Sequence, residues 1–410
     1  MIGTTNVLAR RINQPLLILY GLGTILGAGI YVLVGKVAAE AGLLAPLSFI
    51  FAAFIAWLTA LSYSKLVVLF PKSAGEAVYI EHSFGKKWLT LTVGILIILT
   101  GVVSAATLTN GFIGYLLLLI PVNETIAMIS IVVVLTMVAV WGIAESLMLA
   151  ALITVIEVMG LLIVLAFCGD VLLQLPEKLE QLFVPTSVAQ FTGVLSGAFL
   201  AFYAFIGFED MVNVVEEVKQ PQRTMPRAIF WVVLVSTSLY VLIALVAIFS
   251  LPLEDLSHSN SPLADMLAQR SFGAAKVVSV ISVFAIVNGV LIQLIMASRV
   301  CYGMSKQYGG PVFLHRVSLS TQTPVFATLT IGVAILIFAL FFPLVVLAKF
   351  TSFIILIIFA LVNLALWKLQ RGNYQDASKE SITYIGGLKS YPILAAILCI
   401  GMLVFQISHY

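Results

Sequence analysis

Three acidic residues lie within long apolar stretches of this sequence, and they are the side chains best placed to do chemistry. Glu157 lies in the run LITVIEVMGLL, and Glu209 and Asp210 follow the run AFYAFIGF. Carboxylates at membrane depth are costly, so they normally face protein or water and indicate a functional site. Burial disfavours the ionised form of Glu157, which suits a group that takes and releases a proton. Sodium binding and a purely structural role are the alternatives for this residue.

Glycines interrupt the first apolar stretch, LYGLGTILGAGIYVL from Leu19 to Leu33, at positions 21, 23, 27 and 29. Each glycine costs a helix about 1 kcal/mol relative to alanine, so this run predicts a broken helix. In lipid, the N–H and C=O groups freed by a break need another partner, and a solute bound in a buried cavity can supply one. The alternative is that these glycines only let neighbouring helices approach closely.

A second candidate break lies five predicted helices later, where Gly207 precedes the acidic pair. Broken helices at corresponding positions of two halves predict an inverted five-plus-five repeat, with a site at the midplane between the halves. The N-terminal end of a half-helix offers N–H groups and a positive dipole end to an anion, and the carbonyls of a C-terminal end suit a cation. An α-amino acid carries both groups, so the sequence predicts an amino acid as the small-molecule substrate.

The composition is typical of a polytopic membrane protein, because 61% of the 410 residues are hydrophobic and only 10% are charged. We therefore expect an all-α chain in a lipid bilayer, with about eleven transmembrane helices in a single transporter domain, 1–410. Repeat one covers about 16–173, repeat two covers about 193–369, and an extra helix covers about 391–408. The predicted spans are Leu16–Ala39, Leu44–Phe70, Trp88–Ile120, Thr125–Ile143, Ser146–Leu173, Gly193–Val215, Ala228–Leu251, Ala274–Met304, Pro324–Phe342, Leu344–Leu369 and Tyr391–Ser408.

The distribution of basic residues predicts the orientation of the chain. With the N-terminus in the cytoplasm, most of the 21 lysine and arginine residues fall at inner loops and helix ends. Those that fall at the outer side are Lys36, Lys178, Arg270, Lys276 and Lys349. This bias follows the positive-inside rule, and an odd number of spans then leaves the C-terminus outside.

Other function classes find little support in the residue pattern. The three cysteines and four histidines are scattered without metal-ligand spacing, so we expect no metal site, cofactor or disulfide framework. No nucleophile with a base, or other catalytic constellation, lies within the spans, so we do not expect an enzyme. No nucleic acid partner is expected, and the oligomeric state stays open. A receptor that binds its ligand without transport is the remaining alternative from a different class.

Five segments, in order along nearly the whole chain, resemble motifs of the amino acid–polyamine–organocation (APC) superfamily of permeases. Two of them carry the candidate breaks, and the other three lie at helix ends. They are GLGTILGAGIYVLVG (21–35), PKSAGEAVYIEHSFGK (71–86), AFYAFIGFED (201–210), EEVKQPQRTMPRAI (216–229) and ASRVCYGMSKQYGGP (297–311). Members of this superfamily usually have at least twelve spans, and we count eleven. The missing twelfth span would lie outside the ten-helix core.

The resemblance implies alternating-access transport, with residues of helices one and six around the substrate. These residues are Ile25, Gly27, Ala28, Gly29, Tyr203, Ala204, Phe205 and Gly207. In some proton-coupled relatives a lysine of helix five replaces a sodium ion, and Glu157 stands at that place here, with the sign of the charge reversed. The lysine mechanism therefore cannot be carried over directly, although a coupling role for Glu157 is the sharpest hypothesis.

Further polar residues complete the prediction. Arg299, near the inner end of helix eight, is expected to pair with an acid of helix six in an inner gate that includes Glu209, and charge exchange with Glu216 or Glu217 would test the pairing. The buried amides are interpreted first as helix–helix hydrogen bonds rather than ligand groups; they are Asn110, Asn288, Gln293 and Asn363. We expect a secondary active permease of the cytoplasmic membrane, a proton symporter that favours neutral amino acids. A carrier of cationic amino acids or polyamines, an exchanger and a sodium-driven carrier are the alternatives.

Overall fold

A computed structural model describes residues 10, 12–27, 29–72, 75–141, 147–176, 182–318, 321, 323–371 and 390–409. Over these residues the chain is almost entirely helical, and β structure is limited to an isolated bridge between Ile12 and Val218. The long and medium helices are α1 (Gln14–Leu26), α2 (Gly29–Ala41), α3 (Ala45–Leu69), α4 (Gly75–Phe84), α5 (Lys87–Leu119), α6 (Glu124–Trp141), α7 (Leu147–Cys168), α9 (Val188–Ala201), α10 (Pro221–Ser250), α13 (Phe272–Tyr308), α14 (Val325–Phe341), α15 (Leu344–Arg371) and α17 (Tyr391–Ser408). The short elements are η1 (Gly42–Leu44), η2 (Gly169–Gln174), η3 (Phe202–Phe205), η4 (Glu209–Glu217), α11 (Leu253–His258), α12 (Pro262–Ala268) and η5 (Val312–His315).

The predicted polytopic all-α architecture is confirmed. Nine helical segments of the described chain are long and apolar enough to cross a membrane, and α1 and α14 are shorter apolar helices. Every predicted span overlaps one of these segments. The count of eleven is not confirmed by length and composition, because α1 and α14 are short and α2 continues through η1 into α3.

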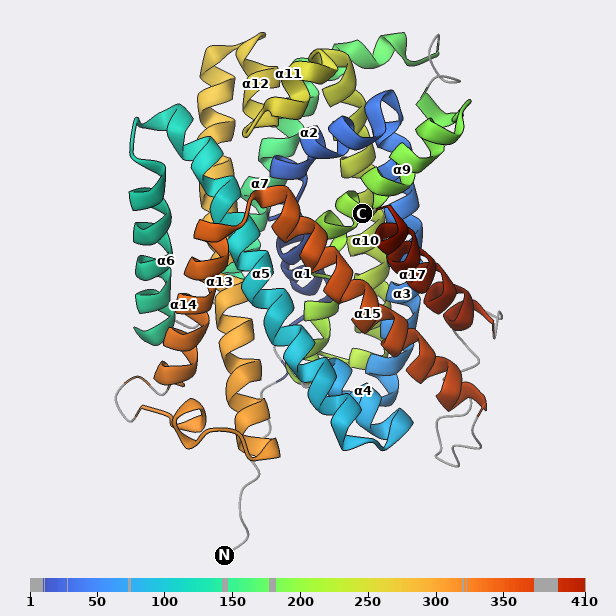
Figure 1. Cartoon of the computed structure of the whole chain (residues 1–410), viewed down its shortest axis with the longest axis vertical. Coiled ribbons are helices and arrows are strands. Elements are labelled where there is room, and N and C mark those ends of the chain that lie inside the picture. Colours follow the sequence, from blue (N-terminus) through green and yellow to red (C-terminus); the bar gives the residue numbers. More distant parts are fainter. Residues whose placement is uncertain are drawn as a thin grey trace, which may run out of the picture.

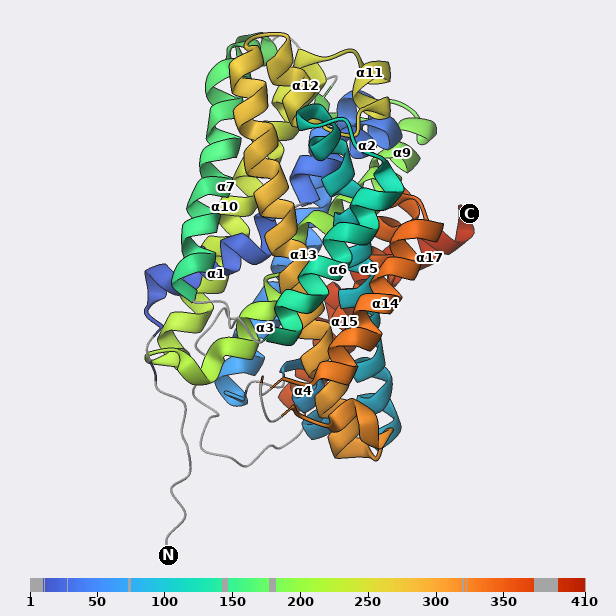
Figure 2. The ribbon, with the colours of Figure 1, turned by 90° about the vertical axis from the view of Figure 1, so that its left-hand side faces the viewer.

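The arrangement of the helices places the two interrupted segments in the middle of the bundle (Figure 1). Helix α13 packs along α5, α10 packs against α3, and α15 packs against α17. Helices α6 and α14 lie side by side at one edge, as both views show (Figures 1 and 2). The short helices α11 and α12 cover one end of the bundle, and α4 lies at the opposite end.

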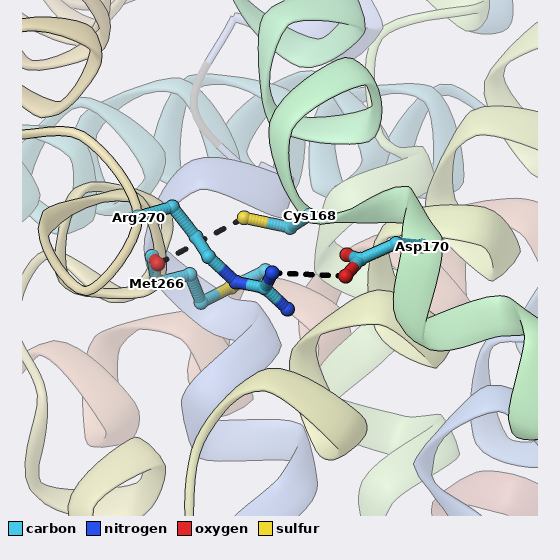
Figure 3. Close-up of polar contacts among 4 residues, drawn as sticks. All are labelled: Cys168, Asp170, Met266 and Arg270. Atoms are coloured by element: carbon cyan, nitrogen blue, oxygen red, sulfur yellow. Dashed lines mark hydrogen bonds and ion pairs between the residues drawn. The ribbon is translucent and has the colours of Figure 1, made fainter.

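Polar contacts at the end near α11 and α12 tie the helices together there. Arg270, just after α12, forms an ion pair of 2.8 Å with Asp170 of η2 (Figure 3). Both side chains are about half exposed, so this pair is worth no more than about 1 kcal/mol. A second ion pair of 2.7 Å joins Glu40, at the end of α2, to Lys349 in the first turns of α15. Figure 3 also shows the weak contact of the Cys168 thiol with the carbonyl of Met266.

Candidate functional site

The first interruption lies between α1 and α2, where the sequence predicts it. Helix α1 ends at Leu26 and α2 begins at Gly29. Ala28, a predicted substrate residue, lies outside the described residues. The break leaves the N-terminus of α2, a helix of 13 residues, inside the bundle. Its first N–H groups lack partners within the helix, which makes this end suitable for an anion such as a carboxylate.

The second interruption lies between η3 and η4. Helix α9 tightens into the 3₁₀ turn η3, Ile206 is extended, and Gly207 has a φ of +129°. An L side chain rarely adopts that conformation, so only glycine is unstrained here. The prediction of a break beside Gly207 is therefore confirmed, and the backbone restarts as η4 at Glu209.

The two interruptions touch each other directly. A Cβ added to Gly29 would lie 2.5 Å from the Cα of Ala204, and a Cβ added to Gly207 would collide with the carbonyl oxygen of Thr24. The hydroxyl of Thr24 donates to the carbonyls of Gly207 and Gly21, each at 2.9 Å. The glycines at both breaks are thus needed for close backbone approach, and Thr24 links one break to the other.

A tyrosine from a third helix binds both breaks at once. The hydroxyl of Tyr240, in α10, lies 2.8 Å from the carbonyl oxygen of Ile25 and 2.9 Å from that of Ala204. Tyr240 is fully buried, and its ring packs against Phe205 with the ring centroids 5.1 Å apart. Carbonyls freed by the breaks therefore have protein donors, which is the internal satisfaction that a break at membrane depth requires.

A small cavity lies where the breaks meet. Its volume is about 30 Å³, room for a few water molecules at most. Four of the predicted substrate residues line it: Ile25, Gly27, Gly29 and Tyr203. Ala204, Phe205 and Gly207 do not line it and instead form the contacts described above. The lining residues that the sequence prediction did not place there are Gly23, Thr24, Ser104, Leu108, Ile206, Gly289, Ile292 and Gln293.

The cavity wall combines apolar side chains with a few uncharged polar groups. Tyr203 and Ser104 pair through their hydroxyls at 3.1 Å, and the Tyr203 hydroxyl also lies 3.2 Å from the Ser104 carbonyl. Among the described residues of the lining, none is an aspartate or a glutamate. The wall itself therefore suits an uncharged side chain, with the N-terminus of α2 available for a carboxylate.

Three acidic side chains are buried together beyond the cavity, toward α4. Glu209 accepts a hydrogen bond of 2.9 Å from the N–H of Gly207, and Asp210 is hydrogen-bonded to the side chain of Gln293. Glu76, in α4, accepts 2.9 Å from the hydroxyl of Tyr63. Burial raises the pKa of the Glu76 carboxyl, and the hydrogen bonds that it accepts oppose that shift.

Glu157 lies fully buried in α7, beside the first break. Its backbone carbonyl accepts a 2.6 Å hydrogen bond from the hydroxyl of Tyr31 in α2. One turn earlier, Thr154 packs so closely on Gly23 that a Cβ there would collide with its hydroxyl. Gly23 lines the cavity, so the Glu157 region contacts the cavity through α1. The predicted coupling role of Glu157 stays a prediction.

The two predicted gate residues Arg299 and Glu209 do not form an ion pair with each other in the described part of the chain. Arg299 is exposed, whereas Glu209 is only 5% exposed. Within the described part of the chain, the two ion pairs are Arg270–Asp170 and Lys349–Glu40. A gating role for Arg299 and Glu209 therefore stays a prediction, and the Glu40–Lys349 pair at the other end is a contact that the sequence did not reveal.

The described chain is thus a polytopic bundle of apolar helices in which two helix interruptions touch beside a small cavity. Residues 12–408 match the model of the amino acid permease family, so the chain belongs to this family of the APC superfamily. The resemblance predicted from the sequence motifs is thus confirmed.

Three relatives illustrate the range of the family. The chain is 29% identical to the vacuolar cationic amino acid transporter 4 of Arabidopsis thaliana, over 84% of this chain and 60% of that protein. It therefore spans less than two thirds of the plant relative. It is 27% identical to the branched-chain amino acid permease BcaP of Bacillus subtilis, over 97% of this chain and 88% of that protein. It is 30% identical to an uncharacterized transporter of Mycobacterium tuberculosis, over 87% of this chain and 79% of that protein.

Proposed function

We propose that the protein is a secondary active transporter that carries neutral amino acids across the cytoplasmic membrane by alternating access. The observation that carries this proposal is the cavity at the two touching breaks, with the N-terminus of α2 on one side and an uncharged wall on the other. The α2 N-terminus is suited to the substrate carboxylate, and the wall is suited to an uncharged side chain. The cavity of about 30 Å³ is small, so the surrounding helices have to move apart before the substrate enters.

We further propose that a proton drives accumulation through Glu157. A carboxyl group in the middle of an apolar helix changes charge only at a high cost, which links its protonation to the packing around it. Its helix contacts α1 and α2, the two halves of the first broken helix. Protonation of Glu157 can therefore favour one arrangement of these halves over another. The orientation proposed has α4 and the N-terminus on the cytoplasmic side, following the basic residues.

Uptake into proteoliposomes tests both proposals. Labelled amino acids are supplied with and without an inward proton gradient, to the wild type and to Glu157→Gln. The expected result is gradient-driven accumulation by the wild type and its loss in the variant, while counterflow exchange survives. Glu124→Gln, at the exposed start of α6, is the matched control and should accumulate like the wild type. Accumulation that ignores the proton gradient and is unchanged in Glu157→Gln would remove the coupling role.

A carrier of cationic amino acids is the second candidate, and a specific observation favours it. Glu76, Glu209 and Asp210 are buried near one another, and no described ion pair neutralises them. Their combined field would attract a positive side chain in the cavity. Competition for the uptake of labelled alanine tests this candidate. Stronger inhibition by lysine or arginine than by leucine would support it.

A further inference from the structure

One glutamine of the cavity lining, on the side that faces Asp210, has a side-chain carbonyl oxygen without a hydrogen-bond partner among the described residues. Gln293, in α13, lines the cavity and is only 7% exposed. Its Oε1 is buried and has no hydrogen-bond partner among the described residues. A buried acceptor without a donor is unfavourable, and such atoms in proteins usually meet a ligand or an ordered water.

The contact with Asp210 determines whether the NH₂ group or the carbonyl oxygen of the Gln293 amide stays open to a ligand. The two side chains are hydrogen-bonded to each other. Because the Oε1 of Gln293 has no partner, the amide meets Asp210 through its NH₂ group, which donates to the carboxyl group, and the carbonyl oxygen stays open to another donor. Asp210 is itself 5% exposed and does not line the cavity, so it acts on the cavity through Gln293.

The other polar side chains of the cavity wall already have partners. The Thr24 hydroxyl donates to backbone carbonyls, and Tyr203 and Ser104 hydrogen-bond to each other. Among the described polar side chains of this lining, each hydroxyl has at least one hydrogen-bond partner, whereas the Oε1 of Gln293 has none and is open to a donor of the substrate. If the substrate carboxylate binds at the N-terminus of α2, the substrate side chain contacts the wall formed by α5 and α13.

We propose that Gln293 recognises a hydrogen-bond donor on the side chain of a neutral substrate, so that the carrier prefers small hydroxyl-bearing amino acids to apolar ones of the same shape. Asp210 is the positioning residue that holds the amide in the accepting orientation. This inference rests on the proposed function and specifies its substrate class. Threonine and valine have nearly the same shape and differ in the donor, so the ratio of their transport measures this contact alone.

The test is initial-rate uptake of labelled threonine and valine into proteoliposomes. The wild type should transport threonine with a kcat/KM at least about tenfold above that of valine. Gln293→Leu should bring the ratio close to one, by raising the KM for threonine while valine uptake persists. Asp210→Asn should lower the ratio less, because the amide can then turn either way. Gln406→Leu removes a similarly buried glutamine of α17 that does not line this cavity, and it should keep the wild-type ratio.

The outcomes separate this inference from the proposed function. Equal transport of threonine and valine by the wild type, or an unchanged ratio in Gln293→Leu, would overturn the role of Gln293. Transport of lysine but of neither threonine nor valine would also overturn it, while leaving amino acid transport intact. If no amino acid is transported at all, the proposed function itself fails. If Gln293→Leu does not fold, Gln293→Met is the substitute, with the same expected loss of preference.

Discussion

Removal of the Tyr240 hydroxyl tests whether a side chain of α10 holds the two broken helices together. The hydroxyl lies 2.8 Å and 2.9 Å from two buried carbonyls, one at each break. A tyrosine carries a single donor proton, so Tyr240→Phe removes the equivalent of one hydrogen bond shared by two acceptors. Buried acceptors that lose their donor cost about 1–3 kcal/mol. An energy of that size changes an equilibrium between conformations by about 5–150-fold.

The measurement is thermal unfolding in detergent, together with the KM for uptake of the best substrate. The phenyl ring keeps its packing against Phe205 and Phe49, so the loss reports on the hydroxyl. We expect Tyr240→Phe to unfold at a lower temperature and to change KM by at least about fivefold. Tyr391→Phe is the control, because its hydroxyl bonds to α3, at 3.3 Å from the carbonyl of Leu61, and not to either break.

Either of two results would refute this reasoning. If Tyr240→Phe unfolds at the wild-type temperature and keeps the wild-type KM, the two carbonyls find other donors and the hydroxyl is dispensable. If Tyr391→Phe changes KM as much as Tyr240→Phe, the effect belongs to any buried tyrosine and not to the link between the breaks.

Three other predictions follow from the same structure. Burial raises the pKa of Glu76, so ionisation of this carboxyl group at high pH destabilises the folded state. Glu76→Gln removes the ionisable group and should therefore unfold at a higher temperature than the wild type at pH 8. The difference in unfolding temperature should disappear near pH 4.5, where the wild-type carboxyl group is protonated in the fold. The partly buried pair Glu40–Lys349 is worth on the order of 1 kcal/mol and neither residue lines the cavity, so Lys349→Glu should change the KM by less than about fivefold, and the double exchange with Glu40→Lys should restore it. Gly207→Ala should abolish uptake, since its φ of +129° and its contact with α1 both exclude a side chain, whereas Gly169→Ala has open space and should transport normally.

The sequence was enough to predict the class of fold and the position of both breaks. Apolar length indicates spans, and glycine in an apolar run indicates a break, because both effects are local to the chain. Gly27 and Gly29 flank the first break, and Gly207 lies at the second. The buried amide Asn363 was also interpreted correctly as a helix–helix contact, since it hydrogen-bonds to Ser62 and Thr59 of α3.

The part of the cavity wall formed by α5 and α13 could not be predicted, because it depends on how these uniformly apolar helices are rotated. Helices α5 and α13 carry hydrophobic residues on all sides, so no periodic pattern identifies the face toward the cavity. Ser104 and Gly289 therefore gave no signal. The sequence predicts Gln293 as a helix–helix contact, and its hydrogen bond with Asp210 agrees with that prediction, although Gln293 also lines the cavity. The sequence also indicates the carboxylate pair Glu209 and Asp210. It does not show that Glu209 binds the N–H of Gly207 while Asp210 contacts Gln293, because these partners depend on the three-dimensional structure.

The carbonyls at the breaks change the expected mechanism of cation recognition. From the sequence, these carbonyls are expected to be free for the ammonium group of a substrate, whereas Thr24 and Tyr240 already donate to several of them. An ammonium group that binds these carbonyls must compete with donors of the protein itself. Because those donors belong to α1 and α10, displacing them loosens the contact between the two breaks. A ligand shifts a conformational equilibrium only through differential contacts, and this exchange of donors would give the substrate such a difference between the closed and the open cavity.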